Sequence, residues 1–178
     1  MKFLAALPQK IPITKEINQM NKKYYTVILA VLYVMFFSVS FSSAADKKPA
    51  EVKKSDKCPV CGMFVAGYKN WLAEIIFTDR TYAVFDGPKD MFRYYLDLKK
   101  YNPSKTASDI SAIYTTDYYS TELKDARKVY FVLGSDVNGP MGAELVPLAT
   151  EAAAKEFLKD HQGKRILKFT EVTMEHLK

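Results

Sequence analysis

Residues 71–88 read WLAEIIFTDRTYAVFDGP, and this stretch predicts how the folded domain begins. Its first eight residues alternate, so that Ala73, Ile75 and Phe77 share one face. This is the two-residue period of a β-strand. A second β-prone run at 81–85 follows after only two residues, and such a short connection predicts a β-hairpin.

A helix is predicted directly after the hairpin, over residues 88–100. Pro88 suits the first turn of a helix, and Met91 begins a series of apolar side chains at helical spacing. We interpret Asp86 as the cap of this helix rather than as an acid catalyst, and Met91 as a core residue. Residues 110–118 then return to a β-branched, tyrosine-rich strand pattern.

The same order of elements is predicted a second time. A helix capped by Thr150 and ended by Gly163 follows two further strands and precedes a last one. We therefore predict an α+β fold of two ββαβ units, at about 58–120 and 126–175, related by internal duplication and each covered by a helix. The strands predicted for the second unit span 128–133, 143–148 and 165–172.

Residues 1–45 are predicted to be an N-terminal extension followed by a secretory signal. Lysines at 22 and 23 precede an apolar run over 24–41, and small residues at 43–45 form a cleavage site. This pattern predicts export to the periplasm and makes Met20 the natural start. If the run is not cleaved, its roughly 18 apolar residues would anchor the chain to the inner membrane.

The charge of the chain argues against binding to nucleic acid. The formal net charge is +6, but five lysines and one glutamate within residues 1–45 account for +4 of it. The net charge of +2 that remains for residues 46–178 is too small to indicate a basic surface for nucleic acid. Residues 46–57 are lysine-rich without apolar periodicity, which predicts a linker, and residues 58–178 then form the folded domain.

Both cysteines of the chain lie in the stretch CPVCGM at 58–63. Two thiols and a thioether so close together favour a soft cation. A Cys-x-x-Cys pair can serve as half of a zinc site, as a redox couple, or as a two-thiolate Cu(I) site. Two cysteines cannot form a disulfide framework for a domain of this size, so local chemistry is the better interpretation.

The surroundings of the pair favour Cu(I) among these three. Zinc needs two further ligands, and His161 and His176 lack the usual closing spacing. A thioredoxin-like couple normally opens a helix after a strand, whereas Gly62 directly follows the second cysteine and the motif precedes the first strand. Met63 beside the thiols supports Cu(I), although packing in the core is the alternative for this side chain.

Met141 is a further candidate ligand. It lies in the glycine-rich segment 134–142, GSDVNGPMG, which predicts a mobile loop. Such a methionine could close over a metal held by Cys58 and Cys61. The alternative is an ordinary strand connection whose methionine packs into the core.

Three blocks of sequence resemble the NosL family of nitrous oxide reductase accessory proteins. The blocks are Cys58–Val65, then Phe85-Asp86-Gly87 with Met91, then Gly139–Pro147. The first and third are specific, and the likeness spans nearly all of residues 58–172. It implies two ββαβ units related in fold to organomercurial lyase, in agreement with the order of elements described above.

The resemblance also implies a function. Members are expected to be periplasmic Cu(I) metallochaperones, not enzymes, that supply copper for the copper-sulfide centre of nitrous oxide reductase. The implied partners are the nitrous oxide reductase apoprotein and its maturation transporter complex. The implied ligands are Cys61, Met63 and Met141, with Cys58 as an extra thiol. No cysteine stands at the cleavage site, unlike in many members, and a thiol-disulfide oxidoreductase using Cys58 and Cys61 is the alternative function.

Overall fold

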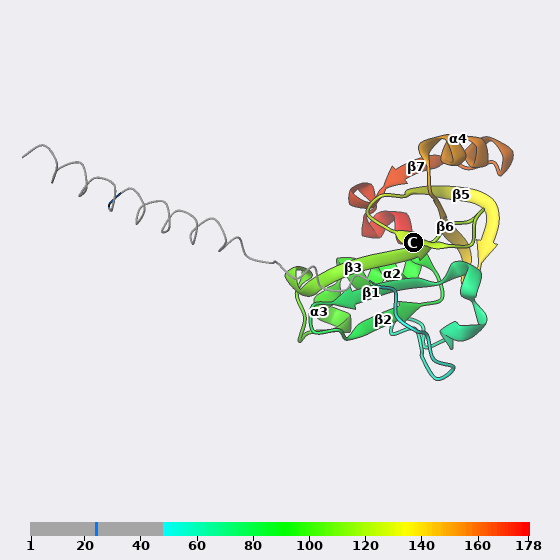
Figure 1. The fold of residues 1–178 in the computed structure, drawn as a ribbon. Helices are drawn as coiled ribbons and strands as arrows, with labels where there is room; N and C mark the ends of the chain where they lie inside the picture. Colours follow the sequence, from blue (N-terminus) through cyan, green and yellow to red (C-terminus); the bar gives the residue numbers. More distant parts are fainter. Residues whose placement is uncertain (1–23, 25–47) are drawn as a thin grey trace, which may run out of the picture. The chain divides into compact units, whose positions relative to one another are not determined.

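The computed structural model describes Tyr24 and residues 48–178, which form two antiparallel β-sheets with helices packed on them (Figure 1). The predicted extension, signal and cleavage site at 1–45 lie outside the described residues, apart from Tyr24. Within the described part of the chain, no helix combines the length and apolar content that crossing a bilayer requires.

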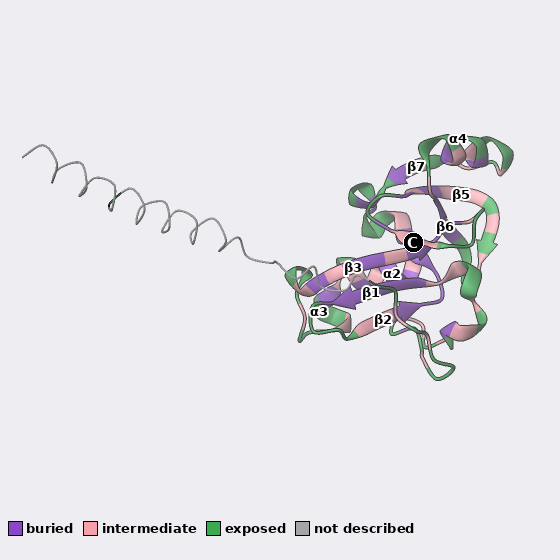
Figure 2. Ribbon diagram, viewed as in Figure 1, coloured by how far each residue is buried: buried purple, intermediate pink, exposed green. Residues whose placement is uncertain are grey.

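The first sheet has four strands in the order β2-β1-β3-β4. The predicted hairpin is present, and Ala73 pairs with Phe85 while Ile76 pairs with Tyr82. β1 is buried along its whole length because strands flank it on both sides (Figure 2). The strands are β1 (Ala73–Phe77), β2 (Tyr82–Phe85), β3 (Ile110–Thr116) and β4 (Leu123–Asp125), the last of which was not predicted.

The second sheet has three strands in the order β6-β5-β7. These are β5 (Tyr130–Gly139), β6 (Gly142–Leu148) and β7 (Arg165–Lys168). The prediction of a mobile loop over 134–142 is wrong for most of its length, because β5 continues to Gly139 and pairs there with Gly142. The pairing of β5 with β6 shifts in register between Leu133 and Asn138, so the glycine-rich segment forms an irregular part of the strand.

The helices follow the predicted positions. α2 (Pro88–Leu96) begins with Pro88 in its first turn, and Asp90 lies near the positive end of the helix dipole. The predicted helix over 88–100 is broken at Asp97, after which the short α3 (Leu98–Tyr101) continues. In α4 (Glu151–Asp160) the Thr150 hydroxyl accepts the Ala153 N–H at 3.1 Å, as the cap prediction requires.

Single-turn 3₁₀ segments complete the structure, and the α+β prediction is confirmed. The order strand, strand, helix, strand occurs twice, as β1-β2-α2-β3 and β5-β6-α4-β7. The two units form separate sheets rather than one continuous sheet. The 3₁₀ segments are η1 (Val65–Gly67), η2 (Lys69–Trp71), η3 (Ala107–Asp109), η4 (Phe169–Glu171) and η5 (Met174–Leu177).

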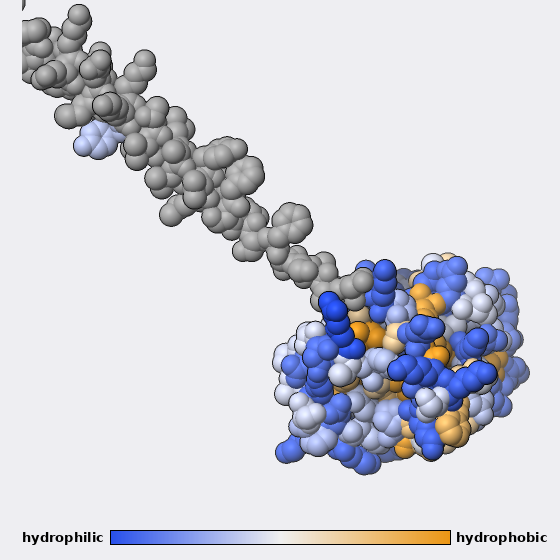
Figure 3. Space-filling view, turned by 60° about the horizontal axis from the view of Figure 1, so that its bottom comes forward, coloured by the Kyte–Doolittle hydropathy of each residue, from blue (hydrophilic) through white to orange (hydrophobic). Residues whose placement is uncertain are grey.

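One hydrophobic core joins the two sheets, and α2 contacts strands of both. Its side chain Phe92 packs edge-on against Phe131 of β5, with ring centroids 4.9 Å apart. The neighbouring Val132 points to the opposite face of β5 and packs in a second cluster with Phe157 of α4. The second sheet is thus buried on both faces. The face of the domain seen in Figure 3 is mainly hydrophilic, with some apolar side chains between the polar ones.

Residues 48–57, within the predicted linker, contact the first sheet. The Ala50 N–H donates to the buried Glu74 carboxylate on β1 at 2.8 Å, and the Tyr82 hydroxyl donates to Asp56 at 3.0 Å. These contacts place the cysteine stretch, which follows directly, beside β2 and α2.

We predict that Phe92→Ala lowers the free energy of unfolding by about 3–5 kcal/mol, because it opens a cavity where α2 meets both sheets. Leu96→Ala on the same helix is the matched control, since Leu96 is exposed, and its effect should stay within about 0.5 kcal/mol. Urea denaturation of both variants measures the difference. Equal losses in the two variants would contradict the central place of Phe92.

Candidate metal centre

The two cysteines are presented by a tight loop, Cys58–Met63, that closes on itself. The Cys58 N–H donates to the Met63 carbonyl at 2.8 Å, and the Gly62 N–H donates to the Cys58 carbonyl at 2.9 Å. Gly62 has a φ of 81°, a left-handed backbone conformation that glycine adopts without strain. A β-bridge between Lys57 and Phe64 fastens the base of the loop. Both thiols therefore extend from the same compact turn.

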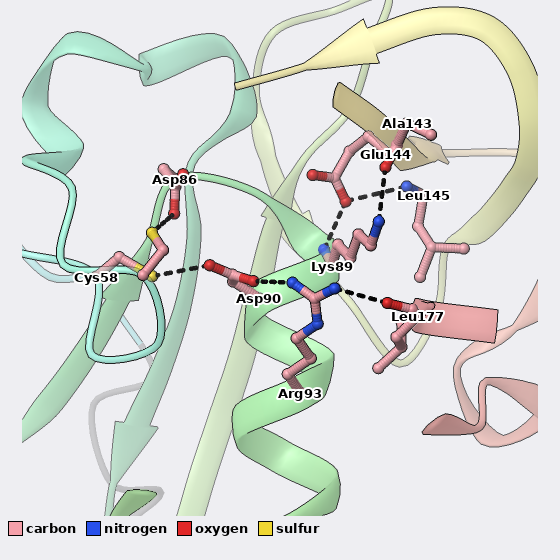
Figure 4. A network of polar contacts seen from close by, with 10 residues as sticks. Cys58, Asp86, Lys89, Asp90, Arg93, Ala143, Glu144, Leu145 and Leu177 are labelled. Atoms are coloured by element: carbon pink, nitrogen blue, oxygen red, sulfur yellow. Dashed lines mark hydrogen bonds and ion pairs between the residues drawn. The ribbon is translucent and has the colours of Figure 1, made fainter. Parts of the chain in front are cut away.

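The start of α2 presents two carboxylates to this loop. Asp86 directly follows the last residue of β2, and Asp90 lies in the first turn of the helix. The prediction that Asp86 caps the helix is wrong. Gly87 is the N-cap residue and provides no side-chain cap, while the Asp86 side chain turns toward the cysteines (Figure 4).

The thiols and carboxylates form two hydrogen-bonded pairs. The Cys58 Sγ donates to Asp90 Oδ2 at 3.4 Å, and the Cys61 Sγ donates to Asp86 Oδ1 at 3.2 Å (Figure 4). One ligand atom from each of the four side chains lies within 4.8 Å of all the others. The cysteines are not linked by a disulfide. This is a compact set of two sulfur and two oxygen donors.

The cluster is almost closed to solvent. Cys58, Asp86 and Asp90 are 1–2% exposed, while Cys61 is partly exposed. Burial raises the pKa of the Cys58 thiol far above its usual value and that of Cys61 to about 11, and the hydrogen bonds to Asp86 act in the same direction. Both thiols therefore keep their protons at neutral pH until a metal ion displaces them.

Arg93 fixes the position of Asp90 from the other side. Its Nη1 donates to Asp90 Oδ1 at 2.8 Å, and its Nη2 donates to the Leu177 carbonyl at 2.7 Å (Figure 4). One guanidinium thus ties the buried carboxylate to the C-terminal η5 segment. A buried carboxylate needs such a partner to offset its desolvation.

Glu144 of β6 connects the second sheet to the same helix start. Its Oε1 accepts the Lys89 N–H at 2.6 Å and the Leu145 N–H at 3.0 Å (Figure 4). The Lys89 amide is one of the first-turn N–H groups that have no partner within the helix. Burial raises the pKa of Glu144 to about 7. This carboxylate holds the turn that carries Asp86 and Asp90 against the β5–β6 hairpin.

The structure brings the predicted ligands Cys58 and Cys61 together in one cluster. Met63 ends the cysteine loop and is half-buried. Met141 lies at the turn of the β5–β6 hairpin and is 46% exposed, so it is not the plug of a core. The neighbouring Ala143 carbonyl accepts a hydrogen bond from Lys89 Nζ at 3.2 Å, which places this turn beside the start of α2.

Sequence reasoning missed the role of three acidic residues: Asp86, Asp90 and Glu144. Asp86 and Asp90 stand on the two sides of the helix start, and two carboxylates within five residues were the available signal for the pair. Nothing local in the sequence marks Glu144, because its partner Lys89 is 55 residues away.

Comparisons with known proteins find relatives of this chain. The NosL family model matches residues 49–177. The copper-binding lipoprotein NosL of Stutzerimonas stutzeri is 28% identical over 133 residues, which are 70% of this chain and 66% of that protein. The chain thus spans just under two thirds of the length of this curated relative. The crystal structure of the copper chaperone NosL from Shewanella denitrificans shares the fold, with a TM-score of 0.62 at 22% identity, over 72% of this chain and 98% of that one.

We predict that Gly87→Ala lowers the free energy of unfolding by about 1–3 kcal/mol, the usual cost of overpacking. A Cβ at this position would lie 2.4 Å from Glu144 Oε2, so it would push the carboxylate off the helix start. Gly67→Ala is the matched control, because its Cβ would meet no atom within 4 Å. Thermal and urea unfolding measure both. If Gly87→Ala were as stable as Gly67→Ala, the Glu144 side chain could move aside without cost, and the prediction would be wrong.

The raised pKa of Glu144 predicts that the free energy of unfolding depends on pH. Its carboxyl ionises near pH 4.5 in the unfolded chain and near pH 7 in the folded one. Between these values the folded state binds the additional proton, so the free energy of unfolding falls as the pH rises, by at most about 1.4 kcal/mol per pH unit. Denaturant titrations at several pH values from 4.5 to 8 give the free energy of unfolding at each pH. This free energy should fall less steeply with rising pH in Glu144→Gln than in the wild type. The exposed Glu156→Gln serves as control, and an unchanged slope in Glu144→Gln would contradict the assignment.

Proposed function

This chain belongs to the NosL family, and from that premise we propose that it binds Cu(I) through Cys58 and Cys61 and carries the ion to an acceptor protein. The observation that carries the proposal is the pair of free thiols gathered in one cluster, of which Cys58 is buried and Cys61 reaches the surface. The names of the relatives, a copper-binding lipoprotein and a copper chaperone, support it.

The two thiols of the cluster suit a soft ion. Thiolates and thioethers select Cu(I), while carboxylates prefer harder cations. Before the metal binds, Asp86 and Asp90 accept hydrogen bonds from the thiols and so hold both sulfur atoms in position. Each thiol loses its proton when it coordinates the ion. The loop therefore needs little rearrangement to form a two-thiolate site.

A methionine would complete the copper site as a weak third donor. Met63 follows the cysteines within the same loop, and Met141 lies on the exposed hairpin turn next to the start of α2. A thioether binds more weakly than a thiolate, so sulfur ligands of an acceptor would replace the methionine first. Because Cys61 is partly exposed, sulfur ligands of the acceptor would then reach the ion from the side of this thiol.

Copper delivery would take place outside the inner membrane. The signal pattern in residues 1–45 and the lipoprotein nature of the curated relative support an exported, periplasmic protein. The acceptor that the family suggests is the nitrous oxide reductase apoprotein, whose copper-sulfide centre would receive the ion through its maturation transporter complex. An uncleaved apolar run would hold the chain at the membrane during this transfer.

The proposed role is binding and delivery rather than catalysis. A thiol-disulfide oxidoreductase requires a cysteine whose pKa is lowered, so that the thiolate can attack. Here burial raises the pKa of both thiols, and each donates a hydrogen bond to a carboxylate. No observation favours the oxidoreductase alternative.

The copper site can be tested by competition with a Cu(I) chelator under anaerobic conditions. Cys58→Ser and Cys61→Ser should each weaken Cu(I) affinity by more than about a hundredfold, since even groups that only support metal ligands cost ten- to a hundredfold. Met63→Ala and Met141→Ala are expected to cost about tenfold if either thioether is the weaker third donor.

Met174→Ala is the control for the methionines, because Met174 is 48% exposed on a different element, η5. It should leave Cu(I) affinity unchanged. Wild-type affinity in both cysteine variants would remove the basis of the proposed function. Wild-type affinity in both Met63→Ala and Met141→Ala would restrict the site to the two thiolates.

A further inference from the structure

We propose that the outer edge of β2 binds an extended, acidic peptide segment of a partner protein by strand addition. In this mode of recognition, a peptide forms main-chain hydrogen bonds with the open edge of a sheet, and its side chains contact the surroundings. β2 is an edge strand of the first sheet, because it pairs with β1 and with no other strand among residues 48–178 (Figure 1). Such docking needs no metal ion and goes beyond the proposed copper binding.

The register of the β1–β2 hairpin shows which main-chain groups point outward. The Phe77 N–H donates to the Thr81 carbonyl at 2.9 Å, and hydrogen-bonded and non-bonded pairs alternate along an antiparallel ladder. Ala83 therefore bonds to β1, whereas Tyr82 and Val84 turn their N–H and carbonyl groups away from it. The main-chain donors and acceptors of these two residues lie on the open edge, where an added strand would pair with them.

The other edge strands carry features that oppose such pairing, and β2 does not. Charged side chains, proline and very short strands are common devices that protect a sheet edge. β4 has three residues and includes Lys124, while β7 contains Arg165 and Lys168. β6 contains Pro147, whose carbonyl accepts the Tyr118 N–H at 2.9 Å. β2 reads YAVF, without a charge, a proline or a shift of register.

A groove of about 420 Å³ lies beside this edge, and Tyr82 and Val84 line it. This volume falls within the range of about 300–1,000 Å³ that is usual for ligand sites. β2 is four residues long, so an added segment of the same length would span roughly 13 Å. The edge therefore offers unpaired main-chain groups together with space for a bound chain.

The groove has walls on opposite faces of the sheet. The Tyr82 hydroxyl donates to Asp56, whereas Phe85 packs against Tyr94 of α2 with ring centroids 5.2 Å apart. Because successive side chains of a strand point to opposite faces, the residues around Asp56 form one wall and the helices α2 and α3 form the other. Alternate side chains of an added strand would contact one wall and then the other.

Each wall carries a lysine, and these lysines favour an acidic peptide. Lys57 lines the groove on one side. On the other side, Lys100 lies over the ring of Tyr101, which also lines the groove, with its Nζ 4.9 Å from the ring centroid. Among the described residues of the lining, Asp56 is the one acid, and its carboxylate accepts the Tyr82 hydroxyl. Carboxylates of an added strand would therefore meet a positive charge on either face.

A peptide bound in this groove would lie beside the cysteine loop, because Pro59 of that loop also lines the groove. The meaning of this position for copper transfer rests on the proposed function, since a partner docked on β2 would be held next to Cys58 and Cys61. Peptide binding itself does not use the thiols. The docking proposal and the copper proposal can therefore fail independently.

The test is fluorescence anisotropy of the full, metal-free chain with a labelled peptide of about six residues in which glutamate and valine alternate. The matched controls are the same peptide with methylated main-chain nitrogens and a peptide with lysine in place of glutamate. The acidic peptide should bind at least about tenfold more tightly than either control, because methylation removes main-chain donors and lysine reverses the attraction. Equal binding of all three peptides, or no binding of the acidic peptide, overturns the proposal.

Variants of the chain test the same site from the other side. Val84→Pro removes an outward N–H but no bond to β1, a place where edge strands tolerate proline, and it should weaken binding of the acidic peptide at least about fivefold. Lys57→Glu/Lys100→Glu should weaken it at least about threefold. The control, Lys128→Glu/Lys159→Glu, changes exposed lysines elsewhere by the same charge and should bind as the wild type does.

Wild-type peptide binding by the Lys57→Glu/Lys100→Glu variant would overturn the acidic peptide as the ligand, even if Val84→Pro does not fold. Sedimentation of the wild type distinguishes a partner peptide from a second copy of this chain. A dimer that Val84→Pro dissociates would show that β2 pairs with itself, which overturns the proposal. A monomer supports an edge that is open to a partner.

Discussion

The Glu144 carboxylate accepts the Lys89 N–H at the start of α2, and the arrangement of the candidate metal centre depends on this bond between the second sheet and the helix. Lys89 lies one residue before Asp90 and three residues after Asp86, so fixing its amide fixes the turn from which both carboxylates extend. Gly87 allows the close approach, because any larger residue would collide with Glu144. The second sheet thus positions donor groups that belong entirely to the first unit.

The pairing of thiols with carboxylates gives the cluster two properties that suit metal transport. Each sulfur is held by a hydrogen bond before the ion arrives, which lowers the cost of organising the site. Each thiol also keeps its proton, because its pKa is raised, and thiols in this form react slowly with oxidants. Metal binding must displace these protons, so affinity and pH are linked.

The four side chains of the cluster differ in the part that they can play toward a metal ion. The sulfur atoms suit Cu(I), and the carboxylates accept the hydrogen bonds of the thiols before an ion binds. The partial exposure of Cys61 leaves one sulfur within reach of a partner, while Cys58, Asp86 and Asp90 stay buried behind it. This asymmetry supports the proposed transfer of an ion from the side of Cys61.

The sequence by itself determined most of the secondary structure and the pair of thiols that we propose as ligands. Alternation in 71–77, the proline at the start of α2 and the Thr150 cap act over a few residues, so they are readable without the fold. The motif blocks were enough to identify the family. The bounds of β5 could not be predicted, because pairing with β6 overrides the loop preference of its glycines. β4, only three residues long, gave no periodic signal.

Only the tertiary structure decided what the acidic residues do. Asp86 has the local sequence of a helix cap, yet it faces Cys61, 25 residues away, because the chain reverses between the cysteine loop and α2. Asp90 meets Cys58 across 32 residues, and Glu144 reaches Lys89 across 55. Such contacts depend on how two sheets pack around one helix. A local pattern specifies the helix, but not which distant loop lies against its first turn.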